Sequence, residues 1–134
     1  MKLLLVKYFK TKWPAIIWSV IVFILLVLPP LSIAKETQLT ISHFDKVIHF
    51  ILFGILVFLW GTYFKTTYQL SKKLILLLFV VFLLATGYGI VMEFVQLKVG
   101  RDFDVWDMLA DAIGAFTAWL YFVIKNRPRW KPGP

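Results

Sequence analysis

Two pairs of ionisable residues stand at the spacing that places side chains on one face of a helix. Asp45 and His49 are four residues apart, and so are Asp107 and Asp111. A carboxylate that orients an imidazole can make a general base, and several carboxylates can hold a divalent ion through oxygen ligands. Glu93 is a further carboxylate and lies inside an apolar stretch. The candidate catalytic residues are Asp45, His49, Glu93 and Asp111.

Ligand binding is the other chemistry that the same residues could support. Arg presents a planar fork of donors that suits phosphate or carboxylate, and we expect Arg101 and Lys98 to contact such a group. The candidate ligand-binding residues are Lys46, His49, Glu93, Gln96, Arg101, Asp107 and Asp111. The sequence predicts no cofactor and assigns no metal ligands. Because Cys is absent and only two His are present, a structural zinc site is not expected.

Four apolar stretches must position these residues, at about 14–31, 46–64, 74–96 and 105–124. Each approaches the roughly 20 residues that a helix needs to cross a bilayer. The chain is 60% hydrophobic with a mean hydropathy of +0.82, and a soluble domain of 134 residues could not bury so much apolar surface. The sequence therefore predicts an all-α fold, an integral membrane bundle of four transmembrane helices in a single domain over residues 1–134.

The distribution of Lys and Arg predicts the orientation of this bundle. Short connections make successive helices antiparallel neighbours. Eleven of the 15 Lys and Arg residues then fall on one side, in segments 2–12, 65–73 and 125–131, together with both termini. The positive-inside rule makes that side cytoplasmic. The net charge of +8 is spread between apolar runs rather than along one face, so the expected partner is the lipid bilayer and not nucleic acid.

A secretory signal is a competing interpretation of the N-terminal stretch. Basic residues, an apolar run and the small-residue pattern Ser32-Ile33-Ala34 resemble a signal that is cleaved after Ala34. The apolar run is somewhat long for such a signal, which favours a retained membrane helix. The other three helices would keep their orientation in either case.

All seven carboxylates and both histidines map to the outer side, which the positive-inside rule does not explain because it concerns Lys and Arg. If a helix enters the membrane near Asp104, Asp111 lies about 10 Å further in. A charge at that depth costs roughly 2.5–3.5 kcal/mol unless it is paired, protonated or hydrated. A capping box that begins at Ser42 could explain Asp45, and a simple N-cap could explain Asp104. For Glu93, Asp111 and His49 the structural alternative is an ion pair that joins helices, and otherwise we expect a polar pocket lined by three helices.

These segments resemble the VanZ-like membrane proteins. Residues 45–54 (DKVIHFILFG) are similar to the DKxxHF opening motif of that family, and residues 93–101 (EFVQLKVGR) to its E-x-x-Q…R segment. Residues 104–115 (DVWDMLADAIGA) are similar to its D-x-x-x-N/D-x-x-G ending, with Asp111 where many relatives carry Asn. The motifs occur in the order and at the spacing of the family, and the motif-bearing core covers about 44–118.

The resemblance implies a multi-pass protein of the bacterial cytoplasmic (inner) membrane with a role at the cell envelope. The family takes its name from a protein of glycopeptide antibiotic resistance clusters that is associated with low-level resistance to teicoplanin. The resemblance supplies no biochemical mechanism, and it does not make this chain a resistance determinant.

Three functions are compatible with these residues. The first is binding or modification of a membrane lipid or cell-wall precursor headgroup by an outer polar pocket, with a possible link to teicoplanin resistance. The alternative is a membrane-embedded hydrolase that acts on a lipid-linked phosphate or ester. A proton-linked transporter comes third, because the cytoplasmic half of each helix is almost uncharged and no relay crosses the membrane. Whether the chain is an enzyme, and its oligomeric state, stay open at this point.

Overall fold

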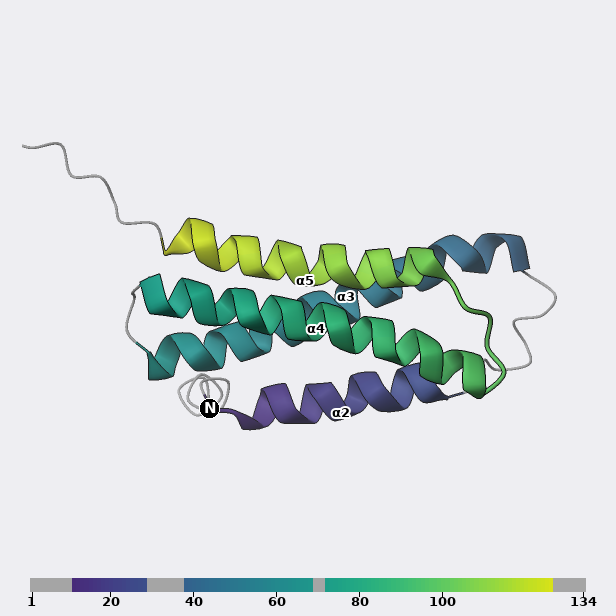
Figure 1. Cartoon of the computed structure of the whole chain (residues 1–134), viewed down its shortest axis with the longest axis horizontal. Helices are drawn as coiled ribbons and strands as arrows, with labels where there is room; N and C mark the ends of the chain where they lie inside the picture. Colours follow the sequence, from purple (N-terminus) through teal and green to yellow (C-terminus); the bar gives the residue numbers. More distant parts are fainter. Residues whose placement is uncertain (1–10, 29–37, 69–71, 127–134) are drawn as a thin grey trace, which may run out of the picture.

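Four helices make up the described part of the chain, which comprises residues 11–28, 38–68 and 72–126 of a computed structural model. They are α2 (Trp13–Val27), α3 (Gln38–Thr67), α4 (Lys72–Lys98) and α5 (Val105–Lys125). Successive helices run antiparallel, and α2 begins at the end of the bundle where α5 finishes (Figure 1). The predicted all-α helical bundle is confirmed.

Three of the helices are long and apolar enough to span a membrane, over Phe44–Thr67, Lys72–Lys98 and Val105–Lys125. The first helix, α2, is shorter, with 15 residues and a length of about 22 Å. Pro14 lies in its first turn, where proline is tolerated, and the helix ends two residues before Pro29. Residues 29–37, which include the proposed signal-cleavage pattern, lie outside the described residues.

The start of α3 differs from the sequence prediction. We expected a helix from about residue 46, with Asp45 in a capping box that begins at Ser42, but α3 begins at Gln38, and Asp45 lies almost two turns inside it. Residues 38–45 contain neither Gly nor Pro, so no helix breaker separates them from the apolar stretch that follows. The capping explanation of Asp45 is therefore wrong, and its carboxylate is available for other contacts.

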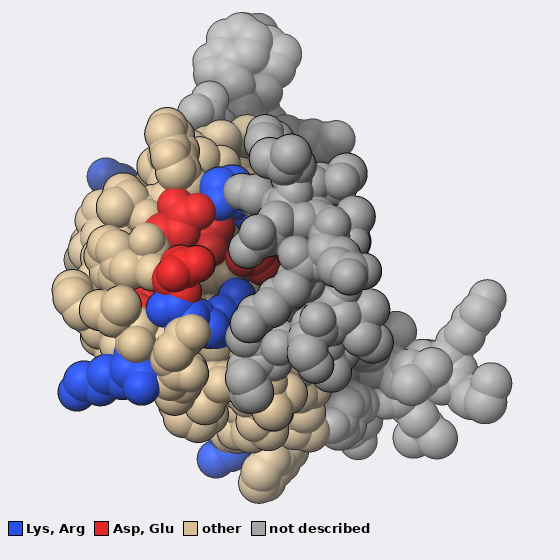
Figure 2. Space-filling model, turned by 90° about the vertical axis from the view of Figure 1, so that its right-hand side faces the viewer, with Lys and Arg blue, Asp and Glu red and all other residues tan. Residues whose placement is uncertain are grey.

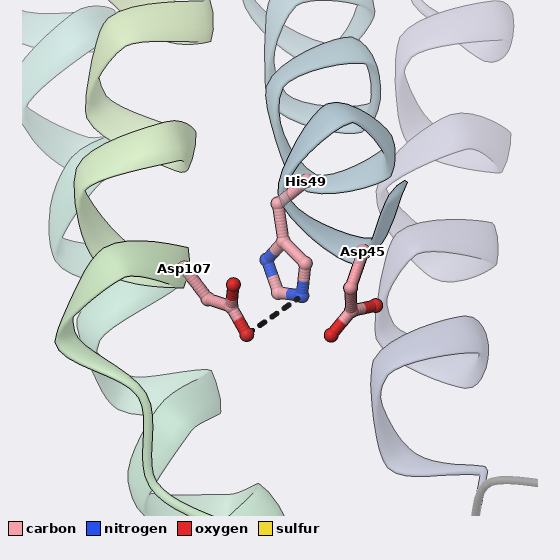
Figure 3. A group of neighbouring side chains, drawn as sticks. All are labelled: Asp45, His49 and Asp107. Carbon is pink, nitrogen blue, oxygen red and sulfur yellow. Dashed lines mark ion pairs between the residues drawn. The ribbon is translucent and has the colours of Figure 1, made fainter. Parts of the chain in front are cut away.

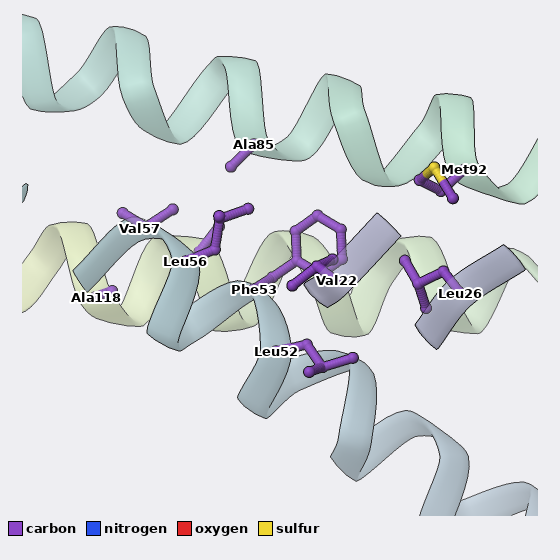
Figure 4. Packing of buried hydrophobic residues seen from close by; sticks show 10 residues of the cluster. Val22, Leu26, Leu52, Phe53, Leu56, Val57, Ala85, Met92 and Ala118 are labelled. Carbon is purple, nitrogen blue, oxygen red and sulfur yellow. The ribbon is translucent and has the colours of Figure 1, made fainter. Parts of the chain in front are cut away.

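One apolar core joins all four helices (Figure 4). Phe53 of α3 is completely buried, and α2 contributes Val22 and Leu26 to the same cluster. Large apolar side chains on the outside of the bundle, such as Leu84 and Phe94, are more than half exposed. Hydrocarbon suits such a surface better than water does, in agreement with a membrane protein.

Two glycines lie at a tight contact between α3 and α5. A Cβ atom on Gly54 of α3 would lie 3.4 Å from the carbonyl oxygen of Gly114 of α5. A Cβ atom on Gly114 would collide with the backbone carbonyl of Phe50. Small residues at such positions let membrane helices approach closely. The contact fixes how α3 and α5 face each other at a point three residues beyond Asp111 and five residues beyond His49.

Candidate functional site

Charged side chains gather at the end of the bundle where α3 and α5 begin and α4 finishes. Figure 2 shows carboxylates at the centre of this face, with Lys and Arg on either side of them. We call the following residues the polar cluster: Asp45, Lys46, His49, Glu93, Arg101, Asp104, Asp107 and Asp111. Four of them are at least 95% buried, namely His49, Glu93, Asp107 and Asp111. The structure thus brings together residues of all three predicted motifs.

His49 and Asp111 form the innermost contact of the polar cluster. The Nδ1 atom of His49 lies 2.9 Å from Oδ1 of Asp111, and both residues are 99% buried. Gly89 of α4 makes room for this carboxylate, because a Cβ atom on Gly89 would collide with Asp111. The helical spacing places Gly89 on the same face of α4 as Glu93, so one face of α4 closes over the pair.

Lys46 links α3 to the first turn of α5. Its Nζ atom donates to Oδ2 of Asp104 at 2.5 Å and to Oδ1 of Asp107 at 3.1 Å. Asp104 is also the N-cap of α5, since its Oδ1 accepts from the backbone N–H of Trp106 at 2.8 Å, as the sequence predicts. The ammonium of Lys46, together with that N–H, holds the pKa of Asp104 below its usual value.

A left-handed residue at the end of α4 positions Arg101. Gly100 has a φ of 85°, a conformation that glycine adopts without steric cost, and the N–H of Arg101 donates back to the carbonyl of Gln96 at 3.0 Å. The turn brings the guanidinium to 3.6 Å from Oδ2 of Asp45. Lys98, by contrast, is exposed and has no ion pair within the described ranges.

Two predicted residues have structural contacts that sequence reasoning missed. The side chain of Gln96 donates to the carbonyl of Leu26 at 3.1 Å and so ties α4 to α2. Glu93 stands at the unfavourable end of its own helix, but its Oε2 accepts the N–H of Asp104 at 3.1 Å, at the start of α5. A carboxylate is favoured at that helix terminus. Only the position of α5 beside α4 could have revealed this role.

Several buried polar atoms of the polar cluster have no hydrogen-bond partner among the described residues. They are Nε2 of His49, Oε1 of Glu93 and Oδ2 of Asp111. Buried polar atoms are nearly always paired with protein or water, so each of these atoms has a hydrogen-bonding capacity that a water, an ion or a ligand group would satisfy. Asp45, His49 and Asp107 also lie close enough to hold a metal ion, although the sequence assigned them no such role. The unpaired atoms of the polar cluster suit the binding of a polar group more directly than any covalent chemistry.

Comparison with known proteins gives a match that covers nearly the whole chain. The sequence model of a family described as VanZ/LLP1 matches residues 2–126. The matched range contains the four helices and every residue of the polar cluster. Comparison with curated proteins and with solved structures found no match.

Proposed function

Because this chain belongs to the VanZ/LLP1 family of membrane proteins, we propose that its polar cluster binds the headgroup of a membrane lipid or lipid-linked cell-envelope precursor. The family match confirms the resemblance to VanZ-like proteins that the motifs predict. One observation carries the proposal. Unpaired acceptors on Glu93 and Asp111 lie buried at the end of a membrane bundle, where the cationic Arg101 is partly exposed.

The chemistry of these groups matches a headgroup with both an anionic part and hydrogen-bond donors. The guanidinium of Arg101 is 3.6 Å from Asp45, which is longer than a hydrogen bond, and its side chain is 18% exposed. It can therefore turn donors toward a phosphate or carboxylate. Oε1 of Glu93 and Oδ2 of Asp111 would accept from hydroxyl, amide or ammonium groups deeper in the bundle.

An apolar groove in the bundle supports a ligand with an acyl chain. The groove has a volume of about 560 Å³ and is lined by side chains of α2, α3 and α4, among them Phe23, Trp60 and Leu84. Trp60 follows His49 by eleven residues on α3, a distance of about 16 Å along the helix axis. The chain of a lipid whose headgroup lies at the polar cluster would reach this depth.

Loss of a retained lipid is the expected result of Arg101→Ala. Native mass spectrometry of the purified protein should show a specific lipid on the wild type and at least tenfold less of it on the variant, because the anionic group loses its partner. Lys98→Ala is the matched control, since Lys98 is an exposed cation three residues away. Equal retention by Arg101→Ala and the wild type would remove the basis of the proposal.

The proposal places the polar cluster on the extracytoplasmic side of a bacterial cytoplasmic membrane, where cell-envelope precursors are exposed. The chain has no Cys, so single cysteines report on the side they face. In intact cells a membrane-impermeant maleimide should label Asp102→Cys strongly, and Thr67→Cys at least tenfold less until the membrane is permeabilised. The reverse labelling pattern would show that the polar cluster faces the cytoplasm.

A change in teicoplanin susceptibility on expression of the protein is the cellular effect that the family suggests.

A hydrolase acting on a lipid-linked phosphate or ester is the second function we propose to test. The observation that favours it is the contact between His49 and the carboxylate of Asp111, which resembles an oriented general base. Turnover of such a substrate by the purified protein, lost in His49→Gln, would favour this function over binding alone. Retention of lipid without turnover would favour binding.

A further inference from the structure

Asp45, His49 and Asp107 direct ligand-type atoms toward one point at the mouth of the polar cluster. Figure 3 shows the imidazole of His49 between the carboxylates of Asp45 and Asp107. One carboxylate oxygen from each Asp and a ring nitrogen of His49 all lie within 4.8 Å of one another. We propose that these three residues bind a divalent transition metal ion of the Zn²⁺ or Mn²⁺ type.

The hydrogen bond of His49 prepares its other nitrogen for this role. An ionised Asp111 can only accept, so at 2.9 Å the Nδ1 atom of His49 carries the proton and donates it. The lone pair of the neutral ring is then on Nε2. A carboxylate on the far nitrogen is the usual way in which proteins orient a metal-bound histidine.

The Nε2 atom of His49 is aimed into the proposed site and is not otherwise used. It is buried and has no hydrogen-bond partner in the described part of the chain. It lies 3.9 Å from Oδ2 of Asp107, which is too long for a hydrogen bond. Two atoms that each lie about 2.1 Å from one ion are themselves about 3–4 Å apart, so this spacing suits two ligands of the same metal.

The balance of charge in the polar cluster also favours a cation. Its carboxylates, Asp45, Glu93, Asp104, Asp107 and Asp111, number five against the two cations Lys46 and Arg101, which leaves a formal charge of −3 with neutral His49. A divalent ion would reduce this to −1. Lys46 bonds Oδ1 of Asp107 and leaves Oδ2 facing His49, so the same carboxylate can serve both cations.

The donor set decides which ions fit. Mg²⁺ and Ca²⁺ prefer oxygen ligands alone, whereas one imidazole with two carboxylates suits first-row transition ions. The side chain of Asp45 is 35% exposed, which provides a way in from solution. Three protein ligands leave positions for water or for the phosphate of a headgroup, but the metal site itself does not depend on the proposed lipid.

Titration of the full-length protein in detergent tests the site. After removal of metals with EDTA, Zn²⁺ and Mn²⁺ are added separately, and we expect one ion per chain. His43→Gln leaves His49 as the only histidine. In this background bound Mn²⁺ should show nitrogen coupling in pulsed electron paramagnetic resonance, and adding His49→Gln should abolish that coupling. Asp45→Asn should weaken binding of both ions at least tenfold, while Asp102→Asn, which removes an exposed acid outside the site, should leave it unchanged.

Several results would overturn the proposal. They are no binding at millimolar metal, binding of Mn²⁺ without nitrogen coupling, or equal affinity in Asp45→Asn and the wild type. Asp45 is partly exposed, so its variant remains informative even if His49→Gln does not fold. Lipid retention is measured separately on the same samples. A protein that retains its lipid but binds no metal would contradict the metal site alone. A protein that binds metal but retains no lipid would contradict the lipid proposal alone.

Discussion

Asp111→Ala is expected to lower the free energy of unfolding by about 2–4 kcal/mol. A hydrogen bond between membrane helices contributes about 0.6–1.7 kcal/mol, and the partner left unpaired in a buried site adds roughly 1–3 kcal/mol. Both terms apply, because His49 and Asp111 are 99% buried and lie 2.9 Å apart. The measurement is reversible unfolding in mixed detergent micelles, followed by far-UV circular dichroism in the presence of EDTA.

Two further variants separate the hydrogen bond from the size of the side chain. Asp111→Asn keeps both the volume and a polar atom facing His49, so we expect it to cost less than about 1.5 kcal/mol. Asp111→Ala combined with His49→Ala should cost clearly less than the sum of the two single variants, since residues in direct contact are not additive. Strictly additive losses would show that the two side chains stabilise the bundle independently.

Hydropathy predicted the apolar parts of the helices, and it failed where α3 extends beyond the apolar stretch. The last helix was expected over 105–124 and spans Val105–Lys125. The second was expected from residue 46, whereas α3 begins at Gln38. Residues 38–45 contain both polar and apolar residues and form no continuous hydrophobic run. A helix prediction based on hydrophobic runs therefore begins only after them. This difference excludes the capping explanation of Asp45 and leaves its role as a side chain of the polar cluster.

Helical spacing predicted which charged residues share a face, but it could not predict their partners on other helices. Asp45 and His49 do share a face of α3, as a spacing of four requires. The pairing of Lys46 with Asp104 and Asp107 depends on the depth and rotation of α5 relative to α3. The contact of Arg101 with Asp45 likewise depends on how the end of α4 is placed beside α3. The relative depth and rotation of helices are set by packing between them, and a pattern along one sequence does not contain this information.

The glycine contact between α3 and α5 is the packing feature that sets the depth and rotation of α5 relative to α3. Gly54 follows His49 by five residues, and Gly114 follows Asp111 by three, so this tight backbone contact lies next to the innermost pair of the polar cluster. Contact through a backbone carbonyl leaves little freedom for α5 to rotate or slide. We infer that the two glycines act on the site through the geometry of the helices, without touching a ligand.

Gly114→Leu is therefore expected to destabilise the bundle by more than about 3 kcal/mol and to separate His49 from Asp111. Overpacking a tight contact typically costs 1–3 kcal/mol, and here the new atoms meet the rigid carbonyl of Phe50 rather than a flexible side chain. Gly87→Leu is the matched control, because a Cβ atom on Gly87 would meet nothing within 4 Å in the part of the chain that the structure describes. Unfolding in mixed micelles gives the stabilities, and retention of lipid and metal by each variant reports on the site. If Gly114→Leu matched Gly87→Leu in both measurements, the close approach of α3 and α5 would not be what holds the polar cluster in place.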